Sequence, residues 1–74
     1  MSFHIGGILS LRKARKIARA LGCIVGIARR SGEIVFTYAP LGLQTRQNSR
    51  RRDATRSTLR FLRKIEEHSW GEDQ

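Results

Sequence analysis

The spacing of apolar residues changes at Gly22, and this change restricts the chain to a helix followed by strands. Before Gly22, apolar residues recur every three or four positions, the period of one helix face. They are Leu11, Ala14, Ile17, Ala18 and Leu21. Ser10 is a preferred N-cap residue, and glycine is preferred just beyond a helix C-terminus. The sequence therefore predicts a first helix between residues 10 and 22.

Two runs rich in β-branched residues follow Gly22 and predict antiparallel strands. One run covers residues 23–29 and a second covers residues 33–39, with Arg30-Ser31-Gly32 between them. Small and glycine residues at such a place are typical of a tight hairpin turn. Pro40-Leu41-Gly42 ends the second strand. The polar residues 43–47 predict a short third strand at an edge of the sheet.

A second helical pattern follows the strands. Asp53 is a preferred N-cap residue, and we expect the final helix to run from Asp53 to about Glu67. Its apolar face consists of Leu59, Leu62 and Ile65, with Phe61 to one side. We expect residues 69–74 to be frayed, with Trp70 able to fold back onto the core.

These elements predict a single α+β domain with the order α-β-β-β-α. A three-stranded sheet with both faces in water would be unstable, so both helices are expected on one face of the antiparallel sheet. We place the domain at residues 10–67, after an N-terminal extension at residues 1–9 and before an acidic tail at residues 68–74. No apolar stretch reaches the roughly 18 residues that a membrane-spanning helix needs.

Positive charge is concentrated in the middle of the chain. All fifteen Lys and Arg residues lie between Arg12 and Lys64, where only Glu33 and Asp53 oppose them. Twelve of the fifteen are arginine, whose planar guanidinium forms paired hydrogen bonds with phosphate. We therefore expect a polyanionic partner. Nucleic acid is favoured over a membrane surface, because a membrane-surface element would need bulky apolar residues opposite the charges along an exposed helix.

The run Arg50-Arg51-Arg52 lies just before the expected helix start at Asp53. Helix N-terminal amides favour anions, so the arginines and the helix dipole are expected to converge on a phosphate. The expected nucleic-acid-binding residues are Arg30, Arg46, Arg50, Arg51, Arg52, Arg56 and Arg60. The cations of the first helix, from Arg12 to Arg19, are equally consistent with a second phosphate-facing surface and with a solvated face.

Cys23 is the only cysteine and lies in the apolar run of residues 23–28. We expect it to be a small buried hydrophobe rather than a nucleophile. A single cysteine also fits a reducing, cytoplasmic location.

The arginines before the last helix, together with the order of elements, resemble the double-stranded-RNA-binding fold. In that family the final helix starts with a lysine pair, a spacer and an alanine, and Arg51-Arg52-Asp53-Ala54 has arginines in the lysine positions. A closer resemblance, over about residues 11–66, is to the HicA-type toxins, which cleave messenger RNA. The residues that carry it are Leu21-Gly22, Ser31-Gly32-Glu33, Phe36, Pro40-Leu41-Gly42 and Thr58-Leu59-Arg60-Phe61-Leu62.

Glu33 marks the departure of this chain from the toxins. The resemblance would require a histidine there, the residue to which RNA cleavage is attributed in that family. A glutamate is a poor general acid at neutral pH, and it repels phosphate. The two histidines, His4 and His68, lie in no motif. We therefore expect no catalytic residue, no cofactor and no metal site.

Three functions remain open at this point. The first is a non-enzymatic module that binds nucleic-acid phosphates, with RNA preferred over DNA. The second is a HicA-like ribonuclease in which Glu33 or His4 replaces the missing histidine. The third is an adaptor for an acidic protein such as an antitoxin or a ribosomal component. The charge and the arginine run favour the first.

Overall fold

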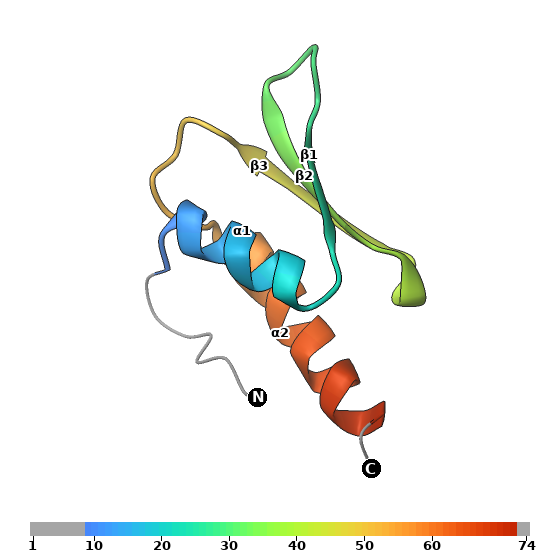
Figure 1. Cartoon of the computed structure of the whole chain (residues 1–74). Helices are drawn as coiled ribbons and strands as arrows, with labels where there is room; N and C mark the ends of the chain where they lie inside the picture. The colour runs from blue at the N-terminus through green and yellow to red at the C-terminus, as the bar shows by residue number, and fades with distance from the viewer. Residues whose placement is uncertain (1–8, 73–74) are drawn as a thin grey trace.

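Two helices and a three-stranded sheet make up residues 9–72, the part of the chain that the computed structural model describes (Figure 1). The order is α1 (Leu11–Ala20), β1 (Ile24–Ile27), β2 (Glu33–Tyr38), the 3₁₀ turn η1 (Ala39–Leu41), β3 (Leu43–Asn48) and α2 (Arg56–Glu72). The strands are antiparallel, and β2 lies between β1 and β3. This confirms the α+β domain with α-β-β-β-α order, and it places β3 at an edge as predicted.

Helix α1 begins and ends where the sequence predicts. Ser10 Oγ accepts a hydrogen bond at 3.2 Å from the amide three residues later, which caps the first turn. Gly22 has a φ of +95°, a left-handed conformation that glycine adopts without steric cost. Its amide donates to the Arg19 carbonyl at 3.1 Å. The Cys23 amide donates to the Ala18 carbonyl at 2.8 Å, which completes a Schellman motif and leads the chain directly into β1.

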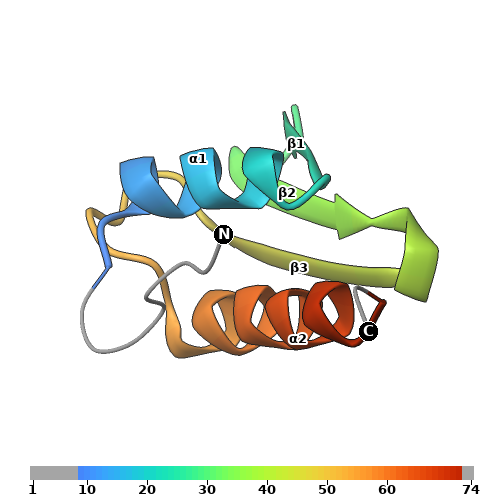
Figure 2. The same cartoon turned by 60° about the horizontal axis from the view of Figure 1, so that its bottom comes forward.

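Both helices pack on one face of the sheet, as predicted, and leave the other face open (Figure 2). The side chains of β2 alternate between these faces. Ile34, Phe36 and Tyr38 are buried on the helix side. Val35 and Thr37 alternate with them on the open face and are only half-buried.

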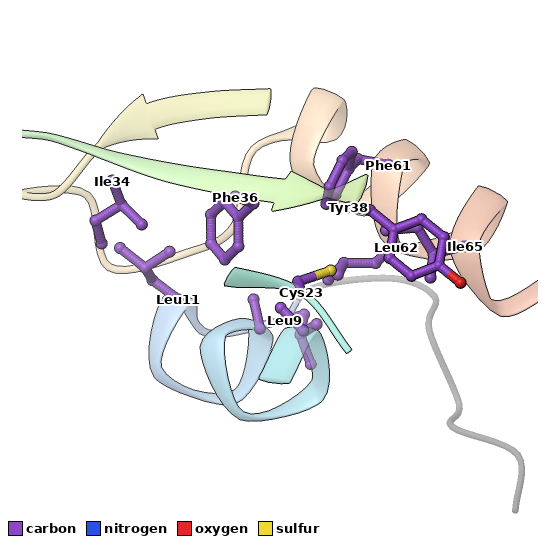
Figure 3. Packing of buried hydrophobic residues seen from close by; sticks show 11 residues of the cluster. Leu9, Leu11, Cys23, Ile34, Phe36, Tyr38, Phe61, Leu62 and Ile65 are labelled. Atoms are coloured by element: carbon purple, nitrogen blue, oxygen red, sulfur yellow. The ribbon is translucent and has the colours of Figure 1, made fainter. Parts of the chain in front are cut away.

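The core lies between the sheet and the two helices (Figure 3). Phe36 is fully buried, and its ring lies 6.3 Å from the ring of Phe61 in a tilted arrangement. Leu62 and Ile65 of α2 are also fully buried. Cys23 belongs to the same cluster, which confirms that it is a buried hydrophobe.

Helix α2 begins at Arg56, so the prediction of Asp53 as its N-cap is wrong. Thr55 has this role, because its Oγ1 accepts a hydrogen bond from the Thr58 amide at 3.3 Å. Asp53 instead pairs with Ser10 in an isolated antiparallel bridge. The bridge holds this part of the chain extended, so the helix starts only after Thr55.

The two ends of the domain also differ from expectation. Leu9, placed in the N-terminal extension, is buried in the core, whereas residues 1–8 lie outside the described residues. Helix α2 continues to Glu72, beyond the end predicted near Glu67, so the prediction of fraying from residue 69 is wrong as far as residue 72. The side chain of Trp70 lies outside the described part. No helix in the described residues is both long and apolar enough to cross a bilayer.

Candidate nucleic-acid interface

The three consecutive arginines lie in the loop that joins β3 to α2, residues 49–55, which we call the arginine loop. Their side chains are exposed, but their backbone is held by hydrogen bonds. The Arg50 amide donates to Asn48 Oδ1 at 2.8 Å. The Arg51 amide donates to the Asn48 carbonyl at 3.3 Å. The last residue of β3 therefore fixes the first half of the loop.

The second half of the arginine loop pairs with the residues that lead into α1. The Leu11 amide donates to the Arg52 carbonyl at 2.7 Å, and the Ala54 amide donates to the Leu9 carbonyl at 2.8 Å. Figures 1 and 2 show the loop beside the start of α1. The arginines end four residues before α2 begins, so the prediction that they adjoin its first-turn amides is wrong.

Gln47 supports the arginine loop from within the core. Its side chain is 3 % exposed although it lies in an edge strand. Its Nε2 donates to the Asp53 carbonyl at 3.2 Å. Its Oε1 accepts from the Thr55 amide at 3.0 Å and from the Thr58 hydroxyl at 2.7 Å. One glutamine thus joins β3, the loop and the first turn of α2.

Gln47 holds the candidate site in place, and the sequence analysis did not identify it. The prediction for β3 relied on its polar composition, which is typical of an edge. The available signal was the alternation of the strand, which places Gln47 on the same face as Leu43 and Thr45. A polar residue on the inward face requires buried partners, and the threonines at positions 55 and 58 supply them.

The β1–β2 turn lies next to the arginine loop. Ser49 Oγ donates to the Gly32 carbonyl at 2.6 Å, and Glu33 is directly opposite Asn48 in the sheet. Gly32, with φ of +70°, completes the turn that carries Arg30. The structure thus brings Arg30 to the same end of the sheet as the three loop arginines.

Helix α2 extends this basic surface along its first turns. Arg56, Arg60 and Arg63 lie on one stripe of the helix and line a groove of about 360 Å³, with Leu59 as its apolar part. The amides of Arg56 and Ser57 belong to the first turn and have no partner within the helix. Arginine side chains and the positive end of a helix dipole therefore meet at Arg56, later in the chain than predicted.

Not every predicted residue lies on this surface. Arg46 is exposed on the open face of the sheet, opposite Val35, and points away from the helix side. Six of the seven predicted residues are grouped at the loop and the start of α2 or beside them, namely Arg30, Arg50, Arg51, Arg52, Arg56 and Arg60. None of these six forms an ion pair within residues 9–72. Their charges therefore face solvent.

His68 lies away from the arginine loop. The ring of His68 lies edge-on to that of Tyr38 at 6.1 Å, at the end of β2 far from the arginine loop. Residues 9–72 contain no group of three His, Cys, Asp or Glu side chains placed to hold a metal ion. His4 lies outside the described residues.

Glu33 and Asp53 lie beside or within the arginine loop, whereas the glutamates of α2 lie away from it. Glu66 and Glu67 are on the C-terminal half of α2, whereas the arginines of this helix are on its N-terminal half. A rise of about 1.5 Å per residue puts Arg56 and Glu66 about 15 Å apart along the axis. The helix is therefore basic where it meets the arginine loop, and its described glutamates lie further along it. Compared with known proteins, the chain matches no family model, no curated protein and no solved structure.

Proposed function

We propose that this domain binds the phosphate backbone of nucleic acid, with RNA preferred over DNA, through the arginine loop and the start of α2. The observation that carries the proposal is the combination of three exposed arginines with a backbone fixed by hydrogen bonds on both sides. Guanidinium groups form paired, charge-assisted hydrogen bonds with phosphate oxygens. Each of these arginines is also without a carboxylate partner in the described residues.

The fixed backbone matters because binding would otherwise have to order the loop. Fixing a flexible residue costs about 1 to 2 kcal/mol in backbone entropy, so an ordered loop retains more of its contact energy as affinity. Gln47 and the bridge between Ser10 and Asp53 supply that order before any ligand arrives.

The preference for RNA rests on the fold order and on hydroxyl groups near the arginines. The α-β-β-β-α order resembles the double-stranded-RNA-binding fold, which reads shape and 2′-hydroxyls more than sequence. The exposed Ser57, next to Arg56 in the first turn of α2, offers a hydroxyl that can both donate to and accept from a 2′-hydroxyl.

A titration of the whole chain against duplex RNA, duplex DNA and single-stranded RNA tests the proposal. If about three to five phosphates are neutralised, the logarithm of affinity for duplex DNA falls against the logarithm of salt with a slope of about −3 to −4.5. RNA is expected to bind more tightly than DNA at equal salt. A slope near zero would remove phosphate contact as the main interaction, and tighter binding of DNA would remove the RNA preference.

A HicA-like ribonuclease remains the second candidate because Glu33 lies beside the arginine loop. Glu33 is half-buried, its amide donates to Ser31 Oγ at 3.3 Å, and its Cα is opposite Asn48. Incubation of single-stranded RNA with excess protein separates the two candidates. The binding module leaves the RNA intact. Cleavage that disappears in Glu33→Ala would favour the enzyme.

A further inference from the structure

Strand β1 lies at an edge of the sheet and carries two exposed isoleucines. Ile24 is 68 % exposed and Ile27 is 63 % exposed. Ile24 is opposite Thr37 on the open face of the sheet, whereas Ile27 is opposite Ile34 on the helix side. A partner stacked on one face would therefore cover only one of the two. A further strand beside β1 would contact both.

The outer edge of β1 has backbone groups available for such a strand. The Ala28 amide donates to the Glu33 carbonyl at 2.9 Å. Backbone groups alternate in direction along an antiparallel strand, so the amides and carbonyls of Val25 and Ile27 point away from β2. Within residues 9–72 they form no backbone hydrogen bond with another segment.

The two edges of the sheet differ in their protection against association. The open face of β3 carries Gln44, Arg46 and Asn48, polar and charged residues that discourage edge-to-edge pairing. The sequence of β1 is Ile-Val-Gly-Ile, with no charge and no proline. Only its short length limits pairing, and Figure 1 shows the turn end of the β1–β2 hairpin extending beyond the helices.

Gly26, in the middle of β1, has no evident role within one copy of the domain. Its φ is not positive, and a Cβ placed on it would meet no atom within 4 Å. Glycine weakens a strand and marks places where another backbone approaches closely. Its position at an exposed edge therefore points to a neighbouring strand.

We propose that two copies of this chain associate by antiparallel pairing of their β1 strands around a twofold axis at Gly26. The result is a continuous six-stranded sheet. In this register Val25 of one copy is opposite Ile27 of the other, and Ile24 is opposite Ala28. All of these pairs are apolar. Ile27 of each copy meets Val25, which already packs against the core of its own domain.

Charge is compatible with this pairing at the strand itself. Arg29 of one copy lies opposite Cys23 of the other, so the two Arg29 residues are six strand positions, or about 20 Å, apart. That exceeds the screening length of about 8 Å at physiological salt.

The lack of charge on β1 favours a second copy over an acidic protein segment as the partner of this strand. Residues 24–28 carry no cation to which acidic side chains could bind. The remaining charge of the two copies, +9 each, is repulsive and is screened by salt. Association is therefore expected to strengthen as salt rises, opposite to the binding of nucleic acid.

Sedimentation equilibrium of the whole chain without nucleic acid tests the proposal. Pairing through four residues per copy is small for a protein interface, so we expect a dimer with a dissociation constant of about 10 to 100 µM that tightens with salt. Ile27→Lys places a charge in the interface at an already exposed position and is expected to weaken association at least about tenfold. Leu41→Lys, which adds the same charge at another exposed apolar residue in η1, is expected to leave it unchanged.

A cross-link tests the register. The two copies of Gly26 are opposite each other at the twofold axis as a non-hydrogen-bonded pair. The Cα atoms of such a pair are about 4.5 Å apart, within the range of a disulfide. Gly26→Cys has room for its side chain in one copy and is expected to give a disulfide-linked dimer under mild oxidation. Arg46→Cys, exposed on β3, is expected not to do so.

Monomers at all concentrations, association that Ile27→Lys leaves intact, or equal cross-linking of the two cysteine variants would each overturn the proposal. These outcomes do not depend on the proposed function, because no nucleic acid is present. In addition, nucleic-acid binding is expected to persist in Ile27→Lys.

Discussion

Gln47 has the largest structural role of any single side chain in the candidate interface. It satisfies two backbone groups of the arginine loop and one threonine hydroxyl of α2 while being almost fully buried. Buried polar networks of this kind fix one geometry, because each alternative leaves a group without a partner. The position of the arginines thus depends on a residue that need not touch the ligand.

Replacement of Gln47 by leucine is expected to destabilise the fold by about 2 to 3 kcal/mol, because the Thr55 amide and the Asp53 carbonyl lose their buried partner. Urea unfolding measures this. Gln44→Leu is the matched control. The side chain of Gln44 is exposed and, among the described residues, bonds only to Thr37 Oγ1, at 3.2 Å, so a change below about 0.5 kcal/mol is expected. Equal losses in the two variants would contradict the role assigned to Gln47.

Cys23 gives a prediction for pH. Burial raises the pKa of Cys23 from 9.0 to about 11, so the folded state favours the neutral thiol. This contribution to stability is complete below pH 9 and is lost as pH rises towards 11, because the unfolded chain ionises first. Between pH 7 and pH 10, the free energy of unfolding should fall more for the natural chain than for Cys23→Ala. Losses of equal size would show that another group is responsible.

At the scale of elements, the start of α2 was predicted incorrectly for a non-local reason. Asp53 and Thr55 are both good N-cap residues, and local preference cannot choose between them. The choice depends on the bridge with Ser10, a residue distant in sequence. In α1, by contrast, Ser10 and Gly22 lie at the ends of the apolar stripe itself, so local signals sufficed. The strands could also be predicted from the sequence, because the two-residue alternation of side chains along a strand is a local pattern.

The candidate site was predictable in composition but not in arrangement. The arginines are visible in the sequence, whereas the backbone that holds them depends on Gln47 and on the contact between Leu9 and Ala54. Arg46 shows the same limit. Its charge suggested a role in binding, but the strand register directs it to the opposite face.

The corrected N-cap gives a direct test. Thr55→Ala is expected to destabilise the fold by about 1 kcal/mol, because it removes the side chain that accepts from the Thr58 amide. Asp53→Ala is expected to change stability by less than about 0.5 kcal/mol, because the contacts of Asp53 are made by its backbone. Thermal unfolding followed by circular dichroism compares the two. The reverse order would restore Asp53 as the cap.

The arginine loop is expected to contribute more to binding than the cations of α1. Arg51→Ala combined with Arg52→Ala should weaken nucleic-acid binding about tenfold or more, since each charged hydrogen bond contributes about 1 kcal/mol or more. Lys16→Ala combined with Arg19→Ala removes the same charge from exposed positions on α1 and should weaken it by less than about threefold. Fluorescence anisotropy at fixed salt measures both pairs. A larger effect of the α1 pair would show that the main binding surface is on α1 and not at the arginine loop.

For the whole molecule, the distribution of charge implies a preferred orientation on a polyanion. The arginine loop, the β1–β2 turn and the start of α2 lie at one end of the sheet, and the glutamates of α2 lie towards the other. Repulsion at the acidic end and attraction at the basic end act in the same direction. A bound strand should therefore contact the end of the domain that carries the arginine loop.

The bridge between residues 9–11 and 52–54 also bears on how the chain folds. It joins segments separated by more than half of the sequence, and closing so long a loop is entropically costly. Such contacts form late unless the intervening elements are already in place. Hairpin and helices can begin to assemble from local contacts, but the arginine loop acquires its shape only when both ends of the domain meet. Nucleic-acid binding would then report completion of folding, and a nascent chain still lacking α2 would carry its arginines without a site.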